Sequence, residues 1–464
     1  MAKCEYKKEY WHSKEKGFVK YKCPHNSIKK PDDNGKKYCI FHSRQDNKKV
    51  NKFYKEFKKK CESGDHEFIG FIFPKSLDFE NLRVEIGGFD FKNANFWKAE
   101  FMGDADLMRS SFFGKTDFRD VIFNGVAIFL GTVFYDNVNF NDATFSDGAN
   151  FWGTIFIKNA YFGGATFSRW VDFYDAKFFR EAYFGEIILS KEVNVFFTKK
   201  IFEDKSKAIF SNFYKFGEKA NLTFDGVNLK NVRFNRANVE KINFKEVFWR
   251  KSRGFTRRNM LFDESFQTGF FKRLLKKTGI FYKDKENEHY EVQNIYNQLR
   301  LNYEKTGRYH EAGDFFVGAM EMRKKGTRES IITRLMLFFY KYISLYGEQP
   351  IMAFLWILLT PFLFIPLYLL SGLKYKDPSR PLECNFFNII DFIKNLNWED
   401  IVNTFYFSLS NLALGKYLSV SFDTGLVPLS NITNFVILLE NVCGLLFITL
   451  FLLAMNRKFR RTKD

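Results

Sequence analysis

Phenylalanine returns every five or six residues through about a hundred residues of this chain. From Ala94 to Glu192 the sequence divides without a gap into nine units of eleven residues, beginning ANFWKAEFMGD, ADLMRSSFFGK and TDFRDVIFNGV. The third position is Phe in every unit except one, which has Leu107, and the eighth is Phe in every unit except the last, which has Leu189. Such a repeat constrains the fold strongly, because every unit has to place its aromatic residues in the same way.

Within each half-unit, a small residue precedes the aromatic position by two. That spacing is typical of a β-strand, in which both side chains lie on one face, and not of a helix with its period of 3.6. The segments are too short for hairpins, so the pattern predicts a continuous coil with Gly, Asp and Asn at its corners. Coils stack about 4.8 Å apart. The inward Phe side chains should therefore form columns that only the stack of coils buries.

A second block, from Leu222, reads LTFDG VNLKN VRFNR ANVEK INFKE, which is five strict pentads. Their central residues are Phe224, Leu229, Phe234, Val239 and Phe244. Together the two blocks, about 94–192 and 222–249, resemble the pentapeptide-repeat family, whose pattern is A(D/N)LXX. The resemblance implies a right-handed quadrilateral β-helix. The eleven-residue units then look like a 5+6 variant, with one extra residue at alternate corners.

The charge of the chain is uneven. The formal net charge is +19, yet the nine long units hold 9 basic and 13 acidic residues. The positive excess lies in residues 1–60 and around 230–285, and a basic patch binds either nucleic acid or anionic lipid. The membrane segments described below favour lipid, so nucleic acid is not the expected partner. Binding of nucleic acid through 230–285 is the alternative. Imitation of DNA by the repeats is not expected, because it would need far more acidic residues on the coil that they form.

Neither secretion nor catalysis is predicted. The first residues, MAKCEYKKEYWH, lack the apolar region of a signal peptide. The sequence has no phosphate-binding loop, no nucleophile elbow and no HExxH motif. We therefore do not expect an enzyme.

Two segments are long and apolar enough to cross a bilayer. Pro350–Leu373 is uncharged, and Ile432–Met455 carries a single carboxylate, Glu440. A basic stretch, RKKGTRES, lies before the first segment, and another, RKFRR, follows the second. This predicts a multi-pass protein of the cell (inner) membrane with both termini, and hence the repeats, on the cytoplasmic side.

Between the two spans lies IVNTFYFSLSNLALG, residues 401–415, which is apolar but too short to cross. The order span, short helix, loop, span resembles the two-transmembrane ion-channel family, with YFS at 406–408 and ENVCGLL at 440–446 as the matching text. The resemblance implies a pore built from several copies, with a tetramer expected. The implied filter residues are Asn411, Leu412, Ala413, Leu414, Gly415, Lys416 and Tyr417.

The filter departs from the potassium-channel pattern. Those channels line it with the carbonyl groups of a TVGYG-type loop, whereas LALGKYLS has one glycine, followed by Lys416. Potassium selectivity is therefore not expected. A ring of lysines would repel cations and favour anions; alternatively, Lys416 reaches to lipid headgroups outside the pore. Glu440 is a functional candidate within a span, but the family resemblance implies that it braces the pore helix by accepting hydrogen bonds.

Residues 286–325 have helical periodicity around a turn at Gly307, which predicts a helical hairpin whose aromatic stripe serves packing. The following text, RESIITRLMLFFYKYISLYGEQP, is amphipathic. Arg334 and Lys341 are seven residues apart and lie on one face, opposite Leu, Met, Phe and Tyr. We expect this helix, with those two residues at the membrane surface, to lie along the inner leaflet. It either passes movement to the first span or simply anchors the chain.

Three cysteines lie beside histidines in the first 42 residues. Cys39 and His42 form a Cys-x-x-His pair, which is half of a tetrahedral zinc site. The candidates for the other half are Cys4 and Cys23, with His12 and His25 competing. The CIFH text resembles the amino-terminal segment of pentapeptide-repeat membrane proteins. That resemblance implies a structural zinc knot of Cys4, Cys23, Cys39 and His42; unpaired structural thiols are the alternative.

The sequence thus predicts a multidomain chain: a β-helix, a helical hairpin and an all-α two-span membrane pore domain. The expected boundaries are 1–62 for the zinc-knot-like segment, 63–250 for the β-helix, 251–327 for the basic linker and hairpin, 328–348 for the interfacial helix and 349–464 for the pore domain, with its re-entrant helix at 401–415. The predicted function is an oligomeric ion channel with a cytoplasmic sensor or scaffold. The alternative is a membrane-tethered binding scaffold without a pore.

Overall fold

The chain forms two compact units, Met1–Lys305 and Thr306–Asp464. The structure, a computed structural model, describes residues 2–12, 17–27, 35–44, 50–190, 193–198, 201–202, 206–211, 220–234, 236–253, 257–266, 288–326, 329–377, 396–412, 422 and 424–460. The division between the units falls inside the predicted segment 251–327. The finer predicted boundaries stay predictions.

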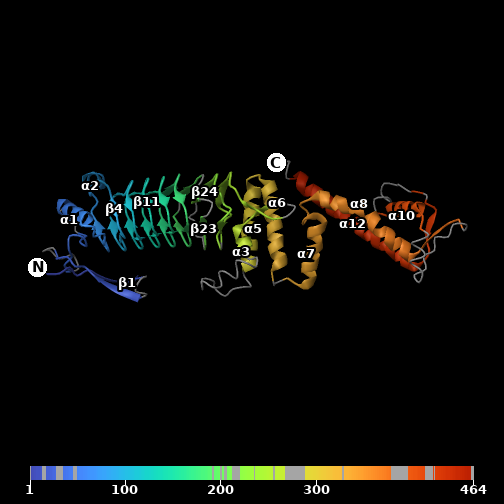
Figure 1. The fold of residues 1–464 in the computed structure, drawn as a ribbon, viewed down its shortest axis with the longest axis horizontal. Coiled ribbons are helices and arrows are strands. Elements are labelled where there is room, and N and C mark those ends of the chain that lie inside the picture. Colours follow the sequence, from blue (N-terminus) through green and yellow to red (C-terminus); the bar gives the residue numbers. More distant parts are fainter. Residues whose placement is uncertain are drawn as a thin grey trace. The chain divides into compact units, whose positions relative to one another are not determined.

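The first unit is built around a β-solenoid of about six turns, made of very short strands in four parallel sheets (Figure 1). Sheet I contains β6 (Ala105–Asp106), β10 (Ala127–Ile128), β14 (Ala149–Asn150), β18 (Trp170–Phe173), β22 (Asn194–Phe197), β24 (Asn221–Asp225) and β26 (Ile242–Lys245). Sheet II contains β4 (Asp90–Phe91), β7 (Ser111–Phe112), β11 (Val133–Phe134), β15 (Ile155–Phe156) and β19 (Lys177–Phe178).

The other two sheets complete each turn. Sheet III contains β8 (Thr116–Asp117), β12 (Val138–Asn139), β16 (Ala160–Tyr161), β20 (Glu181–Tyr183), β23 (Lys207–Ile209) and β25 (Val232–Arg233). Sheet IV contains β3 (Ile72–Phe73), β5 (Glu100–Phe101), β9 (Ile122–Phe123), β13 (Thr144–Phe145), β17 (Thr166–Phe167) and β21 (Ile188–Leu189). The predicted repeat and its solenoid are confirmed.

The strand register gives the length of one coil. Ala127 pairs with Ala149, a coil of 22 residues, so two eleven-residue units make one turn through all four sheets. In the pentad block Leu222 pairs with Ile242, a coil of 20 residues. The difference is two residues per turn, one for each eleven-residue unit.

The fifth position of all nine units has a left-handed backbone, with φ between 51° and 68°. These residues are Lys98, Arg109, Asp120, Gly131, Asp142, Gly153, Gly164, Asp175 and Glu186. Glycine adopts this conformation without cost, and Asp tolerates it, whereas other residues lose about 1–2 kcal/mol. The corner conformation explains why Gly and Asp recur there.

Inside the coils the Phe rings form the predicted columns. Along sheet III, the ring centroids of Phe118 and Phe140 lie 4.9 Å apart, and those of Phe140, Phe162 and Phe184 follow at 5.0 Å each. All four side chains are fully or almost fully buried. This spacing matches the separation of hydrogen-bonded strands, so backbone pairing and ring stacking have the same period.

Replacing Phe140 with Ala should therefore destabilise the middle coils by about 3–5 kcal/mol, because it leaves a cavity between two stacked rings. Hydrogen exchange of the β12 and β16 amides in the full-length chain measures this loss. Ser146→Ala, an outward position on the neighbouring sheet IV, is the matched control and should change stability by less than about 0.5 kcal/mol. Equal exchange in the two variants would contradict the column model.

Helices and two short antiparallel strand pairs flank the solenoid in the described part of the first unit. At the first end lie β1 (Lys7–His12), β2 (Gly17–Lys22), α1 (Val50–Glu62) and α2 (Phe79–Glu85); at the other lie β27 (Arg250–Lys251), β28 (Asn259–Met260), α3 (Phe262–Phe266) and α5 (Glu288–Lys305). On α1, Phe57 packs edge-on against Phe73 at 5.2 Å. On α5, the Tyr303 hydroxyl accepts a 2.8 Å hydrogen bond from the Trp249 indole. Both exposed ends of the stack are thereby shielded.

The second unit is helical. It contains α6 (Tyr309–Lys325), α7 (Ile331–Ser344), α8 (Pro350–Ser371), α10 (Trp398–Asn411) and α12 (Asn431–Arg460), with the short strands β29 (Leu373–Tyr375) and β30 (Leu426–Pro428). Helices α8 and α12 lie side by side, and α10 packs against both (Figure 1). The helix predicted at 401–415 begins earlier, at Trp398, and ends at Asn411. Residues 413–415 lie outside the described residues.

Candidate metal centre and membrane-helix site

The hairpin β1–β2 brings Cys4 and Cys23 together at its open end. Lys7 pairs with Lys22 in the last rung of the hairpin. Beyond this rung the Cys23 N–H donates to the Tyr6 carbonyl at 3.1 Å. The antiparallel register therefore continues to the level of the two thiols.

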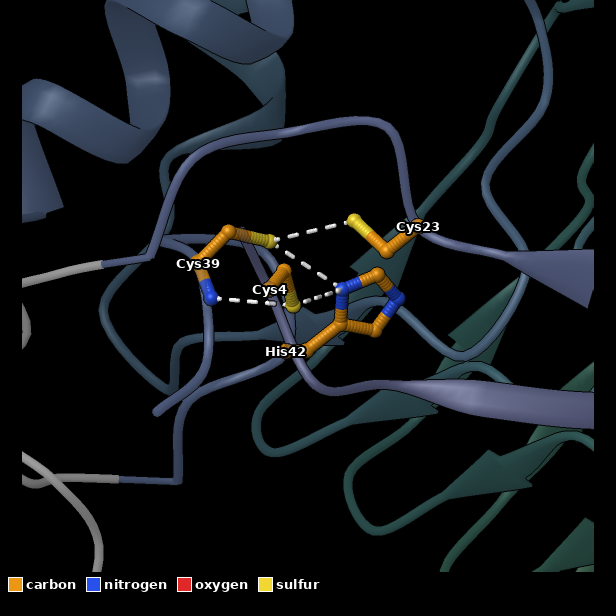
Figure 2. A group of neighbouring side chains, drawn as sticks. All are labelled: Cys4, Cys23, Cys39 and His42. Atoms are coloured by element: carbon orange, nitrogen blue, oxygen red, sulfur yellow. Dashed lines mark hydrogen bonds between the residues drawn. The ribbon is translucent and has the colours of Figure 1, made fainter. Parts of the chain in front are cut away.

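Cys39 and His42 lie on one tight turn, closed by a 3.2 Å bond from the His42 N–H to the Cys39 carbonyl. The Cys39 N–H donates to the Cys4 sulfur at 3.2 Å. The four candidate ligands Cys4, Cys23, Cys39 and His42 are buried, and their ligand atoms all lie within 4.8 Å of one another (Figure 2). The sequence left His12 and His25 as competitors; among the described residues, the group that forms is Cys3His.

The His42 ring is oriented for coordination. Its Nε2 lies 2.9 Å from the Ile69 carbonyl, and because a carbonyl only accepts, Nε2 carries the proton. Nδ1 then points its lone pair at the sulfurs, 3.1 Å from Cys39 and 3.7 Å from Cys4. A backbone carbonyl that accepts from the other ring nitrogen, and so fixes the tautomer, is typical of metal-bound histidine. His25 instead packs edge-on against Phe41 at 4.9 Å.

The donor set fits a small, soft divalent cation. A tetrahedral site with metal–sulfur bonds of about 2.3 Å has ligand–ligand edges of about 3.8 Å, and the Cys23 and Cys39 sulfurs lie 3.7 Å apart. Hydrogen bonds from Cys23 and Cys39 lower the pKa of the Cys4 thiol. Hydrogen bonds with Cys39 and Cys4, together with burial, raise the pKa of Cys23. A metal would bind all three as thiolates, so binding releases protons.

The metal group is joined to the first coil. Phe41, between the two ligands of the turn, stacks on Phe71 with ring centroids 4.3 Å apart. The Ile72 N–H, at the first strand of sheet IV, donates to the Phe41 carbonyl at 2.7 Å. The group therefore lies at the start of the aromatic core and closes it.

In the second unit, two helices are long and apolar enough to span a membrane: Pro350–Ser371 and Asn431–Phe459. Large apolar residues are exposed along both. They include Ile351, Phe354, Leu358, Phe362 and Leu367 on α8, and Phe435, Leu438, Val442, Leu446 and Leu453 on α12. So large an apolar surface is covered by lipid or by other chains in most proteins that carry one.

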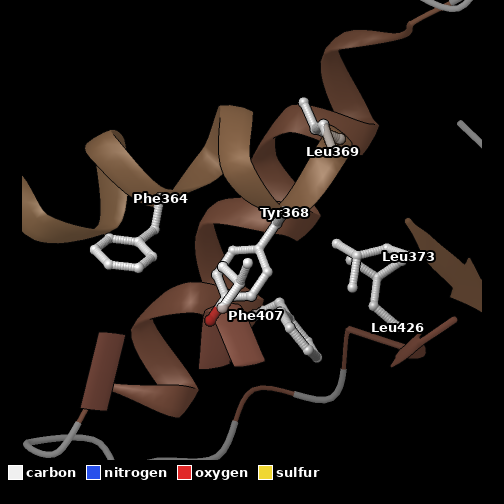
Figure 3. Close-up of a cluster of buried hydrophobic side chains, with 7 residues drawn as sticks. Phe364, Tyr368, Leu369, Leu373, Phe407 and Leu426 are labelled. Carbon is white, nitrogen blue, oxygen red and sulfur yellow. The ribbon is translucent and has the colours of Figure 1, made fainter. Parts of the chain in front are cut away.

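Glu440 on α12 connects the three central helices. Its carboxylate is fully buried. It accepts one hydrogen bond from the Tyr368 hydroxyl on α8 and another from the Ser408 hydroxyl on α10. Phe407, beside Ser408, packs edge-on against the Tyr368 ring at 5.3 Å (Figure 3).

An apolar cluster and a second polar contact complete this junction. The cluster consists of Phe364, Tyr368, Leu369, Leu373, Phe407, Leu426 and Val436 (Figure 3). At its edge the Thr433 hydroxyl donates to the Gly372 carbonyl at 2.7 Å, so the start of α12 is fixed to the end of α8. The antiparallel pair β29–β30 joins the same two ends. The short helix α10 is thus held between the two longer ones.

Two of the seven predicted filter residues lie in the part of the chain that the structure describes. The Asn411 side-chain amide donates to the Phe407 carbonyl one turn earlier at 2.9 Å, and Leu412 is buried. The other predicted filter residues, Ala413, Leu414, Gly415, Lys416 and Tyr417, lie outside the described residues.

The two basic residues predicted at the membrane surface face α6. Arg334 donates to the Gly326 carbonyl at 2.7 Å, and Lys341 pairs with Glu321 at 3.1 Å. The exposed side of α7 is apolar and comprises Ile331, Ile332, Leu335, Met336, Phe338, Phe339 and Tyr342. Burial opposes the ionisation of Glu321, but the Tyr346 hydroxyl and the charge of Lys341 outweigh it, so the pKa of this carboxyl is lowered.

A strained connector joins α7 to α8. Leu345, Tyr346 and Gly347 all have left-handed backbones, with φ of 48°, 59° and 78°. The two non-glycine residues each cost about 1–2 kcal/mol in this conformation. Two contacts hold it: the Tyr346 hydroxyl donates to Glu321 at 2.7 Å, and Arg457, near the end of α12, donates to the Tyr346 carbonyl at 3.0 Å.

A family model described as pentapeptide repeats in nine copies matches residues 108–155. The chain contains pentapeptide repeats. The matched stretch lies within the eleven-residue block and covers a minority of the chain. No curated protein and no solved structure matched the sequence.

The sequence analysis did not find the partners of Glu440 or the contacts around Tyr346. Tyr368 was a detectable signal, because a hydroxyl within an apolar span needs a partner. Glu321 and Arg457 gave no such signal, since both lie among other charged residues in the sequence.

Proposed function

We propose that this chain is the subunit of an oligomeric membrane ion channel, with a tetramer as the expected assembly. Helices α8 and α12 are its two spans, α10 is its re-entrant pore helix, and residues 411–417 form its filter. The observation that carries the proposal is the buried Glu440 carboxylate, which binds a short helix to both longer ones. A span that served only as an anchor would gain nothing from a buried carboxylate, which costs free energy to dehydrate.

The length of α10 supports a re-entrant position. Its 14 residues extend about 21 Å, less than the roughly 30 Å of a bilayer core. It begins with a capping box, in which Asn397 and Asp400 satisfy the first backbone N–H groups. Glu440 holds it at Ser408, in its last turn, and the helix ends at Asn411. Backbone that stops within a membrane needs such a protein or water environment.

The membrane helices of one chain are too few to enclose a pore, so a closed ring of copies is required. The exposed apolar residues of α8 and α12 would contact lipid and neighbouring subunits. The sequence of the predicted filter lacks the TVGYG-type pattern of potassium channels, so we propose a pore that does not select potassium. In this pore Lys416 repels cations. The role is transport and not catalysis.

The rest of the chain is proposed to lie at the cytoplasmic side of the inner membrane, as the basic flanks of the spans indicate. The solenoid is proposed to be the right-handed quadrilateral type of the pentapeptide family, closed by a zinc ion on Cys4, Cys23, Cys39 and His42. The ion would stabilise this end and supply no chemistry. The apolar side of α7 would lie in the inner leaflet, and the contacts of Tyr346 would connect α6 to the ends of both spans.

Planar-bilayer recording of the purified protein with unequal KCl on the two sides tests the proposal. We expect ion currents, and the sign of the reversal potential distinguishes anions from cations. Lys416→Ala should shift the reversal potential towards that of cations, because a ring of positive charges is lost. Lys374→Ala, which removes an exposed charge outside the predicted filter, is the matched control. A monomer or dimer without ion flux would instead support the tethered scaffold.

A further inference from the structure

One side of the solenoid is apolar although it faces outward. In the second, fourth, sixth and eighth eleven-residue units, the ninth residue, which directly follows the second inward Phe, is large and apolar. The fourth residue of these same units is also large and apolar. We call the exposed members of this surface the aromatic face: Phe113, Tyr135, Trp152, Ile157, Tyr174 and Phe179. Each is between 36% and 48% exposed.

The aromatic face is continuous because its members lie on successive coils. Strands β7, β11, β15 and β19 of sheet II are neighbours, and each is followed directly by one member. The rings of Phe113 and Tyr135 stack at 4.8 Å. The rings of Trp152 and Tyr174, at the adjacent corner between sheets I and II, lie 5.4 Å apart.

The other side of the same coils provides the contrast. At the ninth position the third, fifth, seventh and ninth units carry Asn124, Ser146, Ser168 and Ser190; at the fourth position they carry Arg119, Asn141, Gly163 and Gly185. The first unit departs from this alternation, with Trp97 at its fourth position and an exposed Met102 at its ninth. All nine units need the same inward residues to fill the coil. The outward positions do not have to fill the coil. The alternation of their residues between even-numbered and odd-numbered units therefore reflects a property of the surface on one side of the solenoid.

We propose that the aromatic face binds the aromatic face of a second copy of this chain. The two solenoids have the same coil spacing, so the exposed side chains on successive coils of one copy are in register with those of the other along the whole face. The six side chains expose roughly 500 Å² per chain, given about 150–250 Å² for each aromatic side chain. A pair of faces then buries about 1,000 Å², which is the lower limit for a biological interface.

Charges at the rim favour an antiparallel pair. Asp136 follows Tyr135, and Lys158 follows Ile157 on the next coil. A two-fold axis crossing the face between β11 and β15 places Asp136 of each copy beside Lys158 of the other. A parallel pair would instead place each of these charged residues beside the same residue of the other copy, so that like charges would meet. The proposal concerns the first unit only and does not depend on a conducting pore.

Cysteine cross-linking of the full-length protein tests the inference. In a background where Cys61, Cys384 and Cys443 are replaced by Ser, Ile157→Cys should be cross-linked to a dimer by a short bismaleimide. Ser168→Cys, at the ninth position on the opposite side, is the matched control. We expect at least tenfold more dimer from Ile157→Cys. Adding Tyr135→Glu should abolish it, whereas adding Ser146→Glu should not; all four positions point outward, so the fold is retained.

Two results would overturn the inference. The first is equal cross-linking at Ile157→Cys and Ser168→Cys, which would mean that the aromatic face does not meet its copy, whatever the pore does. The second is quenching of Trp152 fluorescence by brominated lipid in vesicles, identified by its loss in Trp152→Phe. That result would assign the face to a lipid surface.

Discussion

Chelation of the metal from the zinc-loaded, full-length protein should unfold the segment that precedes α1. Among the described residues of this segment, the hairpin β1–β2 is the one regular element. A two-stranded hairpin is marginal by itself in water. Binding of zinc to a Cys3His set contributes about 10–16 kcal/mol at neutral pH in small zinc domains. We therefore expect the β1 and β2 amides to lose their protection from hydrogen exchange when the metal is removed.

Two cysteine variants separate the metal from a general effect of lost thiols. Cys39→Ser removes one ligand of the buried group and should abolish stoichiometric zinc in the purified protein. Cys61→Ser removes a thiol that lies outside the group and should leave the zinc content unchanged. Native mass spectrometry measures both. Full protection of β1 and β2 in a zinc-free protein would show that the four side chains are ordinary packing residues.

The same site should lose zinc affinity as the pH falls. The pKa of Cys23 is raised in the metal-free group by its hydrogen bonds with Cys39 and Cys4 and by burial. Zinc binds its thiolate, so a proton has to leave when the metal enters. Lower pH therefore favours the metal-free form, and each released proton weakens binding about tenfold per pH unit.

The solenoid was predictable because its signal is local and repeated. Each Phe lies two residues after a small residue, and the same choice recurs in all nine units, so no long-range information is needed to predict inward columns. The caps were not predictable in this way. Tyr296 on α5, for example, donates to Glu264 at 2.7 Å and also contacts Arg258, two residues that sequence analysis assigned to a basic linker.

The candidate sites were predictable in composition but not in pairing. His42 was one of three candidate histidines, and what distinguishes it is the Ile69 carbonyl, 27 residues away, that orients its ring. The partners of Glu440 lie 32 and 72 residues away. No periodic pattern connects such positions, because the contacts depend on how separate helices pack.

Replacing Glu440 with Leu should reduce the conductance of the assembled channel at least tenfold. The change leaves the hydroxyl groups of Ser408 and Tyr368 without their acceptor in an apolar environment, at about 1–3 kcal/mol each. The pore helix α10 would then lose its polar attachment to both spans. Asn441→Ala, one residue further along α12, is the matched control, because its amide donates to the Ile437 carbonyl within the same helix. Single-channel recording and the mass of the detergent-solubilised oligomer measure the effect.

A triple variant distinguishes a brace from a conducting group. If Glu440 acts only by accepting these two hydrogen bonds, removing the donors as well should be better tolerated than removing the acceptor alone. Glu440→Leu combined with Ser408→Ala and Tyr368→Phe should therefore recover part of the conductance that Glu440→Leu loses, since no buried hydroxyl is left unpaired. A carboxylate that lined the ion path would give no such recovery. Unchanged conductance in Glu440→Leu would remove the brace from the mechanism, because the packing around Tyr368 would then suffice to hold α10.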